Sequence, residues 1–276
     1  MDFVFQRSYR GPLKAVILDW AGTITDYGSR APAMVFVEVF KQHGVPITPA
    51  EARVPMGQAK KEHIRQITQM EAVVQRWVDV HGRLPNEADV EQLYENFIPL
   101  QLEVLPQYAD LIPGTLEAIT DFRRRGLKIG TNTGYNREMV NILLAEARQR
   151  GFEPDSTVCA SDVPAGRPEP WMSLLNALEL RIFPMEALVK VDDTLPGIAE
   201  GLNAGMWTIG LAKTGNELGL SEAEINALPP ELLQDKLKRA YQRMVQAGAH
   251  YVVDGIWDAP RLLDDINARL ARGERP

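Results

Sequence analysis

Four groups of polar residues in this sequence each follow a short apolar run of the kind that forms a buried strand. They are Asp19, Thr131 with Thr133, Arg167 in a loop, and Asp192 with Asp193. Because the carboxyl ends of parallel strands meet at one edge of a sheet, we expect these side chains to converge. Carboxylates from two strands suit Mg²⁺, and a guanidinium beside hydroxyl groups suits a phosphoryl group. A carboxylate held there can attack phosphorus in line and form an aspartyl-phosphate.

The elements that must position these residues alternate between strands and helices. Ala15 to Leu18 is a continuous apolar run that ends at Asp19 and passes into the small residues from Ala21 to Thr23. Further strands are predicted at 127–130, 156–160, 187–191, 206–211 and 251–253, with helical patterns between them. This alternation predicts an α/β fold with a parallel, doubly wound sheet and right-handed crossovers.

The segment from about Pro32 to about Tyr108 has little strand signal and is predicted to be helical. Helical patterns cover 34–40, 60–70, 71–80 and 87–105, and the residues from Pro49 and from Pro85 are typical of helix starts. We therefore predict an all-helical cap domain, residues 27–107, inserted into an α/β core domain of residues 1–26 and 108–276. A chain of 276 residues is long enough for one large and one smaller domain.

The composition argues against several classes of partner. A formal net charge of -7 leaves no excess of Lys and Arg for binding a nucleic acid. No apolar stretch has the length of a membrane span, and Met1–Arg7 lacks the basic segment and long apolar run of a signal peptide. The single cysteine, Cys159, cannot form an intramolecular disulfide and fits a reducing compartment. We expect a cytoplasmic protein without a nucleic acid or membrane partner.

The order of the site residues resembles the haloacid dehalogenase (HAD) superfamily of phosphotransferases. In that superfamily a nucleophilic Asp ends the first strand, a Thr or Ser follows the second, a cationic residue comes next, and an acidic pair ends the fourth. The resemblance implies a HAD-like, Rossmann-type parallel-sheet core with a cap. Most phosphatases of the superfamily carry Asp-x-Asp in the first loop, whereas this chain has Asp19-Trp20-Ala21. The second carboxylate, which protonates an oxygen leaving group, is missing.

This missing acid indicates a leaving group that needs no proton from position 21. A halide fits, and so does a carbon whose electrons are accepted elsewhere. A Schiff base between a Lys amine and an aldehyde beta to phosphorus would accept the electrons of a C–P bond. On the helix predicted from residue 60, Lys60 shares the apolar face with His63 and Ile64, while Lys61 turns toward solvent. Partial burial lowers the pKa of a Lys and supplies the neutral amine.

With this cap lysine, the resemblance narrows to the phosphonoacetaldehyde hydrolase (phosphonatase) family. The matching stretches cover nearly the whole chain: 15–23, 26–28, 55–57 with Lys60 and His63, 133–135, 137–139, 162–168, 170–171, 203–207, 217–220 and 248–250. The resemblance implies hydrolysis of a small-molecule phosphonate, phosphonoacetaldehyde, to acetaldehyde and phosphate, in phosphonate degradation and with Mg²⁺ as cofactor. It also implies a homodimer formed through the cap, with which the apolar face of Met34–Phe40 is compatible.

The family implies a role for each matching site residue. Asp19 is the nucleophile and a Mg²⁺ ligand, and the backbone carbonyl of Ala21 and the carboxylate of Asp193 are further ligands. Lys60 forms the imine with the substrate aldehyde, and His63 takes part in proton transfer during imine formation. The other matching residues belong to the substrate site. Thr133 and Arg167 hold the phosphoryl oxygens and Tyr135 lies nearby, while Met56 and Gly57 help to shape the face of the cap.

One part of the metal site departs from the family pattern. The family often has a further Asp four residues after the metal-binding Asp, and here that position is Gly197. Asp192 stands where some relatives have Gly. The sequence leaves open whether Asp192 or water completes the metal shell.

Two other functions are compatible with parts of the sequence. A 2-haloacid dehalogenase also lacks the second Asp, but it predicts no Mg²⁺ dependence and no cap lysine, so Lys60 and the acidic pair argue against it. A catalytically silent binding or regulatory protein is the third hypothesis, because fold alone does not imply function. Against it, every residue of the site pattern is present except the one at Gly197.

Overall fold

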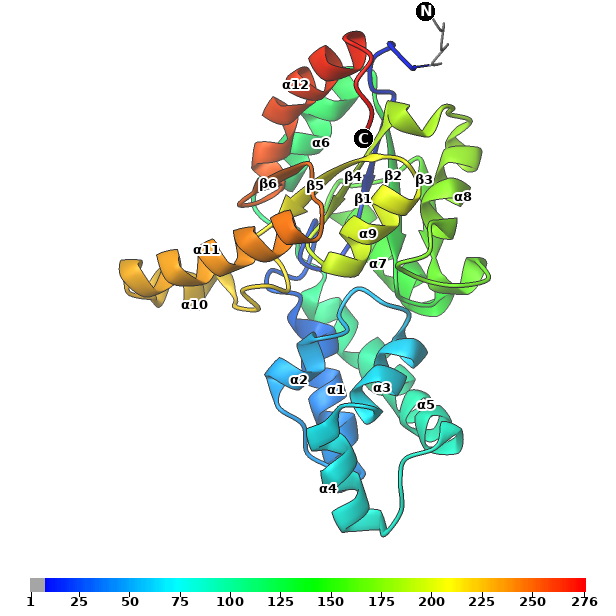
Figure 1. The fold of residues 1–276 in the computed structure, drawn as a ribbon, viewed down its shortest axis with the longest axis vertical. Helices are drawn as coiled ribbons and strands as arrows, with labels where there is room; N and C mark the ends of the chain where they lie inside the picture. The colour runs from blue at the N-terminus through cyan, green and yellow to red at the C-terminus, as the bar shows by residue number, and fades with distance from the viewer. Residues whose placement is uncertain (1–7) are drawn as a thin grey trace, which may run out of the picture.

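One six-stranded sheet forms the centre of the larger part of the molecule; the computed structural model describes residues 8–276 (Figure 1). Its strands are β1 (Ala15–Leu18), β2 (Lys128–Thr133), β3 (Ser156–Cys159), β4 (Leu188–Asp192), β5 (Trp207–Leu211) and β6 (Tyr251–Val253). The order is β3-β2-β1-β4-β5-β6 and every pair is parallel, which confirms the predicted sheet. β2 continues past its predicted end at Gly130 because residues 130–133 pair with β3.

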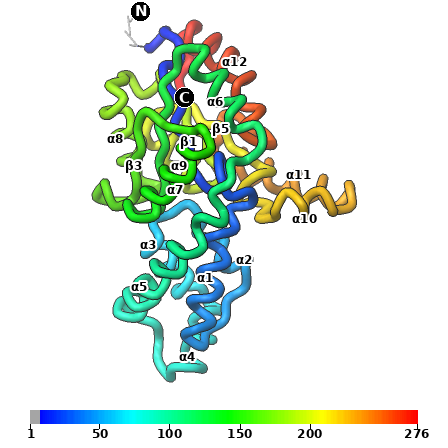
Figure 2. Tube along the Cα trace, turned by 180° about the vertical axis from the view of Figure 1, so that it is seen from behind, coloured from blue at the N-terminus to red at the C-terminus, as the bar shows by residue number. Residues whose placement is uncertain are grey.

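Helices cover both faces of this sheet. One face carries α6 (Thr115–Arg124), α7 (Arg137–Gln149) and α12 (Ala259–Ala271), which are in front in Figure 2. The other carries α8 (Trp171–Leu180), α9 (Leu195–Asn203) and α11 (Pro230–Gln246), with the short α10 (Glu222–Ala227) beside α11. Side chains of β1 alternate between the two cores: Val16 and Leu18 belong to the first, and Ala15 and Ile17 to the second.

A group of five helices projects from the edge of the sheet at which β1 ends (Figures 1 and 2). They are α1 (Arg30–Gln42), α2 (Pro49–Arg53), α3 (Lys60–Thr68), α4 (Glu71–His81) and α5 (Glu87–Val104). Their apolar faces pack around Trp77 and the stacked rings of Phe36 and Phe97, whose centroids lie 4.5 Å apart. Capping boxes begin α2 at Thr48 and α5 at Asn86. The helices lie where the sequence predicts them, and the domain boundaries near residues 27 and 107 remain a prediction.

Short 3-10 turns join several of these elements. They are η1 (Leu105–Tyr108), which returns the chain from α5 to the core, and η2 (Ala160–Asp162), η3 (Met185–Ala187) and η4 (Ile256–Asp258). Within the described residues, no helix combines the length and the apolar character that crossing a membrane requires. The signal-peptide prediction concerns Met1–Arg7, which lie outside the described residues.

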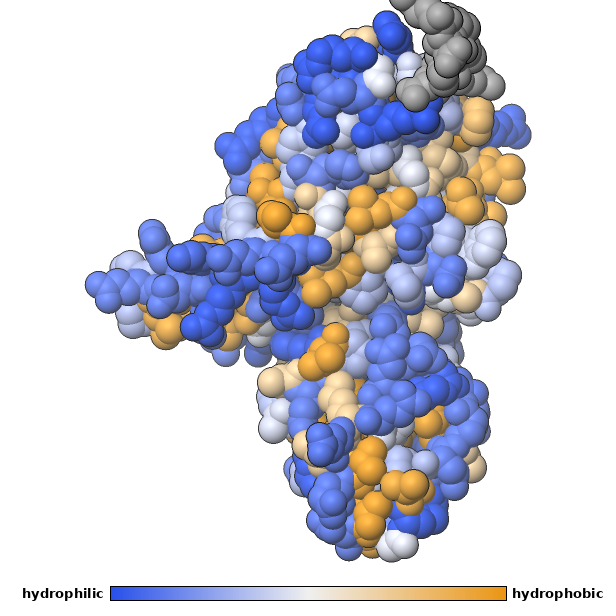
Figure 3. Space-filling model, viewed as in Figure 1, coloured by the Kyte–Doolittle hydropathy of each residue, from blue (hydrophilic) through white to orange (hydrophobic). Residues whose placement is uncertain are grey.

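The apolar residues of Met34–Phe40 mostly face the inside of the helical group. Four of them are buried, namely Val35, Phe36, Val39 and Phe40, whereas Met34 is 51% exposed. A helical apolar period does not distinguish a partner helix of the same chain from a second subunit, and here α5 is the partner. Figure 3 shows hydrophobic and hydrophilic side chains interspersed on the visible surface of this group. The homodimer therefore stays a prediction, without an exposed apolar face at 34–40 to support it.

Substitution of Phe97 tests how far the stability of the helical group depends on its own core. We expect Phe97→Ala to lower the free energy of unfolding by about 3–5 kcal/mol, because it removes a fully buried ring that stacks on Phe36. Phe183→Ala is the control: this residue is 73% exposed, and its loss should change that free energy by about 0.5 kcal/mol or less. Urea denaturation followed by circular dichroism measures both variants. Equal losses would contradict the packing of α1 on α5.

Candidate active site

Most of the predicted site residues line one pocket between the sheet and the helical group. The core supplies Asp19, Ala21, Thr133, Tyr135 and Arg167, and the helical group supplies Met56, Gly57 and Lys60. The lining is completed by Ser29, Pro32, Gly134 and Thr194. Two predicted residues, Asp193 and His63, are not part of this lining. The structure therefore brings together residues from six separate stretches of the chain, namely 19–21, 29–32, 56–60, 133–135, 167 and 194.

The strand order explains this convergence. β1 lies between β2 and β4, with Leu18 opposite both Thr131 and Val191. The backbone N–H of Asp19 still donates to the carbonyl oxygen of Val191, at 3.1 Å, so Asp19 and Asp192 leave the sheet side by side. From the central pair of β1 and β4, the sheet continues to β2 and β3 on one side and to β5 and β6 on the other. The strand order therefore reverses between β1 and β4, and a crevice opens at such a point, at the carboxyl ends of the strands.

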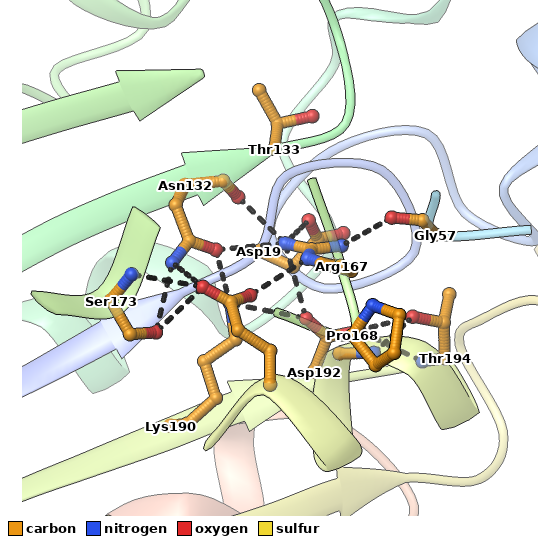
Figure 4. A network of polar contacts seen from close by, with 12 residues as sticks. Asp19, Gly57, Asn132, Thr133, Arg167, Pro168, Ser173, Lys190, Asp192 and Thr194 are labelled. Atoms are coloured by element: carbon orange, nitrogen blue, oxygen red, sulfur yellow. Dashed lines mark hydrogen bonds and ion pairs between the residues drawn. The ribbon is translucent and has the colours of Figure 1, made fainter. Parts of the chain in front are cut away.

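Arg167 is held at this edge by buried polar groups (Figure 4). Its Nη2 lies 2.6 Å from Asp19 Oδ1 and donates to both oxygens of Asn132, at 2.8 and 3.0 Å. Its Nε donates to Glu200 Oε2 at 2.9 Å, and its Nη1 donates to the carbonyl oxygen of Gly57 at 3.3 Å. Burial raises the pKa of Asp19, and the neighbouring Arg167 opposes that shift. The predicted nucleophile and the predicted phosphoryl-binding cation are thus in direct contact.

Three buried carboxylates meet at the ends of β1 and β4, with ligand oxygens of Asp19, Asp192 and Asp193 within 4.8 Å of one another. The negative charge of Asp192 is compensated by its neighbours. Its Oδ1 accepts hydrogen bonds from the N–H and the hydroxyl of Thr194, at 2.9 and 2.7 Å. Its Oδ2 lies 3.2 Å from Lys190 Nζ and 3.3 Å from Arg167 Nη2. Burial favours the neutral acid, but these two cations outweigh it and keep the pKa of Asp192 below its usual value.

Asp193, in contrast, forms no ion pair with a cationic side chain of residues 8–276. Its Oδ2 accepts from the backbone N–H of Asn216 at 2.8 Å, and its Oδ1 from the hydroxyl of Thr23 at 3.4 Å. Burial, together with the carboxylates of Asp19 and Asp192, raises the pKa of Asp193 well above its usual value. A bound divalent cation would supply the missing positive charge, so this acidic group fits a divalent metal.

Gly197 provides the space that the Asp192 carboxylate fills. A Cβ atom at position 197 would lie 2.0 Å from Cγ of Asp192 and 2.1 and 2.2 Å from its two oxygens. A side chain at 197 and the observed position of Asp192 therefore exclude each other. The room that Gly197 leaves on α9 is thus occupied by the Asp192 carboxylate at the end of β4.

The interior face of α3 presents Lys60 to the pocket. Lys60 is 7% exposed, and its Nζ lies 4.8 Å from the ring centroid of Tyr135 and 5.7 Å from that of Phe36. Burial lowers the pKa of this amine to about 8. The neighbouring Lys61 pairs with Glu91 at the surface, which confirms the predicted division between the two lysines.

His63 lies on the same face of α3 and is fully buried. Its Nε2 is 2.8 Å from the carbonyl oxygen of Ala52, and because a carbonyl only accepts, Nε2 carries the hydrogen. Its Nδ1 is then an acceptor, and it has no hydrogen-bond partner within the described part of the chain. Burial, and then the charge of Lys60, lower the pKa of His63 well below its usual value. The ring is therefore a neutral base close to the amine.

Sequence reasoning missed three buried polar residues behind the pocket, namely Asn132, Lys190 and Glu200. Lys190 donates to Asn132 Oδ1 and lies 3.5 Å from Glu200 Oε2. A lysine inside the apolar run of β4 was a usable signal, because a strand buried on both faces seldom carries an unpaired charge. Asn132 and Glu200 gave no such signal, since polar residues in a strand and a helix are ordinary at a surface.

The fold and this site define a class of enzyme. A sequence model described as a haloacid dehalogenase-like hydrolase matches residues 13–205. The chain therefore belongs to the haloacid dehalogenase-like hydrolases. A putative β-phosphoglucomutase from Bacteroides vulgatus, 20% identical, shares the fold with a TM-score of 0.64, covering 94% of this chain and 90% of its own.

More similar relatives place the chain within that class. Phosphonoacetaldehyde hydrolases of Syntrophobacter fumaroxidans and Nitratidesulfovibrio vulgaris are 48% and 47% identical over 99% of this chain, and over 99% and 98% of their own. The crystal structure of a phosphonoacetaldehyde hydrolase-like protein from Oleispira antarctica is 45% identical with a TM-score of 0.97, covering 100% of both chains. The chain is a member of the phosphonoacetaldehyde hydrolase family.

Gly197→Ala tests the steric coupling between positions 192 and 197. We expect it to lower the free energy of unfolding by about 1–3 kcal/mol, because the buried Asp192 carboxylate must move. Asp192→Ala opens that space, so the cost of the added methyl group should fall by about 1 kcal/mol or more in the double variant. Urea denaturation of the four proteins of this double-mutant cycle measures the coupling. Additive losses would contradict it.

Proposed function

We propose that this chain hydrolyses the C–P bond of phosphonoacetaldehyde to acetaldehyde and phosphate. The observation that carries the proposal is the placement of Asp19, Arg167 and Lys60 around one pocket. A carboxylate and a guanidinium lie at the edge of the sheet, and an amine with a lowered pKa lies on the helical group. The names of relatives that are 47–48% identical over nearly the whole chain support the same substrate.

Lys60 is proposed to bind the aldehyde. With a pKa of about 8, a useful fraction of its amine is neutral near neutral pH. The amine adds to the aldehyde carbon, and loss of one water gives an imine whose protonated form accepts electrons. His63 is proposed to assist proton transfer in this step by accepting a hydrogen bond at its unpartnered Nδ1.

Asp19 is proposed to attack phosphorus. As the bond from its carboxylate oxygen to phosphorus forms, the C–P bond breaks, and its electron pair moves into the iminium to give an enamine. Protonation of the enamine carbon and addition of water then release acetaldehyde and free Lys60. A further water hydrolyses the aspartyl-phosphate and releases phosphate. The electrons of the broken bond leave through the imine, which is why Ala21 can stand where a phosphatase has its acid.

The remaining pocket residues are proposed to hold the phosphoryl group and to close the site. Asp19, Asp193 and the carbonyl of Ala21 would hold Mg²⁺, which when bound lowers the negative charge that the nucleophile meets at phosphorus. Thr133 and Nη1 of Arg167 would donate to phosphoryl oxygens. The walls of the pocket include Met56, Gly57 and Tyr135.

Gly57 permits the helical group to close on the core. Its φ is +96°, and a Cβ there would lie 2.3 Å from Thr194 Oγ1, so only glycine allows this approach. In this arrangement its carbonyl oxygen accepts from Arg167 and Met56 is only 2% exposed. Such closure would keep bulk water from the enamine before it is protonated.

Three further assignments rest on the family resemblance. We propose that residues 27–107 act as a cap domain, that two copies of the chain associate through it, and that the enzyme works in the cytoplasm. Met34, 51% exposed on α1, is the residue of 34–40 that remains most available for such a contact.

Phosphate release from phosphonoacetaldehyde, with and without Mg²⁺, tests the function. We expect release by the wild-type chain with Mg²⁺, little after chelation, and a fall in kcat of about 10³-fold or more in Asp19→Asn, because the amide is a poor nucleophile. Inorganic phosphate and acetaldehyde should appear in equal amounts. The proposal fails if neither product forms, and release of chloride from a 2-chloroacid would support the dehalogenase alternative instead.

Borohydride trapping tests the role of Lys60. With substrate present, we expect reduction to leave a covalent adduct on Lys60, and its yield to rise from about pH 6 to about pH 9 with a midpoint near 8, because only the neutral amine adds to the aldehyde. Lys60→Met should lose both adduct and activity. The control Lys61→Met should keep both, since Lys61 lies at the surface with Glu91. Full activity in Lys60→Met, or labelling elsewhere, would rule out the imine.

A further inference from the structure

Glu200 joins several elements behind the pocket without lining it. It lies on α9 with its side chain fully buried. Oε1 accepts from Asn132 Nδ2 at 2.9 Å and from the N–H and hydroxyl of Ser173 at 2.9 and 2.7 Å. Oε2 accepts from Arg167 Nε at 2.9 Å and lies 3.5 Å from Lys190 Nζ. One carboxylate thus connects β2, β4, α8 and the loop of Arg167. The side chains that these elements contribute point toward one another in Figure 4, where they are labelled Asn132, Lys190, Ser173 and Arg167.

These contacts determine how the guanidinium of Arg167 is oriented. The group is planar, and it is anchored at Nε by Glu200 and at Nη2 by Asp19 and Asn132. Anchors at two of its three nitrogens prevent rotation of the plane, so Nη1 has a fixed position. Nη1 contacts the carbonyl oxygen of Gly57, which itself lines the pocket.

We propose that Glu200 is a positioning residue of the phosphoryl site, holding Arg167 so that the guanidinium stays against Asp19 and offers Nη1 to the phosphoryl oxygens. This inference rests on the proposed role of Arg167 in binding phosphate. Glu200 acts through Arg167 and does not touch the substrate. Its charge is part of the role, because Glu200 faces both buried cations of this network, Arg167 and Lys190, at 2.9 and 3.5 Å.

Glu200→Gln is an informative variant because every partner of this carboxylate is a donor. An amide NH₂ in place of Oε2 would face Arg167 Nε and Lys190 Nζ. In place of Oε1 it would face Asn132 Nδ2 and the N–H of Ser173. Neither orientation satisfies the network, so Arg167 should lose its fixed position. Glu200→Asp keeps the charge but is one methylene shorter, and it should recover part of the effect.

Binding of inorganic phosphate tests the proposal independently of C–P cleavage. By titration calorimetry with Mg²⁺ present, we expect Glu200→Gln to weaken phosphate binding about 10- to 100-fold, and Glu200→Asp to weaken it less. Glu179→Gln is the matched control. Glu179 also accepts a hydrogen bond from a serine hydroxyl, that of Ser156 at 2.6 Å, but Ser156 is the first residue of β3 and so lies away from the carboxyl ends of the strands. Its phosphate affinity should be unchanged. Thermal unfolding and circular dichroism establish that each variant is folded.

A double-mutant cycle with Arg167→Ala separates positioning from general damage. If Glu200 acts through Arg167, Glu200→Gln should change phosphate affinity by less than about twofold once Arg167 is Ala. Additive losses, or no loss in Glu200→Gln alone, would overturn the role of Glu200. Unchanged affinity in Arg167→Ala alone would instead overturn the proposed role of Arg167. Glu200→Asp serves in the same cycle if Glu200→Gln does not fold.

Discussion

The buried contact between Arg167 and Asp19, 2.6 Å long, is the interaction on which the rest of the site depends. Taking both charges out of water is costly, and their mutual attraction offsets that cost only when other groups complete their hydrogen bonds. Here Asn132 and Glu200 complete those of the guanidinium, and Lys190 balances the additional negative charge. Strands, helices and loops that are distant in sequence are thereby held to one edge of the sheet.

The adjacent carboxylates Asp192 and Asp193 take different parts in this arrangement. Asp192 faces Lys190 and Arg167 and is held ionised, so it belongs to the charge network behind the pocket. Asp193 forms no ion pair among the described residues, and burial raises its pKa, so it belongs to the side that suits a metal ion. The two neighbouring carboxylates thus differ in the charges around them, and the one without an ion pair in residues 8–276 is the one that suits a metal ion.

The site also joins two environments that a single strand or helix could not provide together. The sheet edge concentrates carboxylates and one guanidinium, whereas α3 surrounds Lys60 with the rings of Phe36 and Tyr135. Burial on the second side disfavours the charged form of the amine, which is why its pKa is about 8. A carboxylate paired with a guanidinium and a partly neutral amine thus line one pocket.

Local patterns were enough to predict the parallel sheet, the helical insertion and the buried face of Lys60, because strand and helix periods report which side chains face a core. The short apolar run before Asp19, and Ala21 two residues beyond it, also led from the sequence to the proposed nucleophile and to the proposed kind of bond that is cut. Other features required the tertiary structure. Lys190, Asn132 and Glu200 lie on separate elements and act only in contact, the room for Asp192 comes from Gly197 on the following helix, and the apolar face of α1 proved to be covered by α5. Periodicity identifies a buried face, but only the packing of distant elements decides what buries it and which charges it must balance.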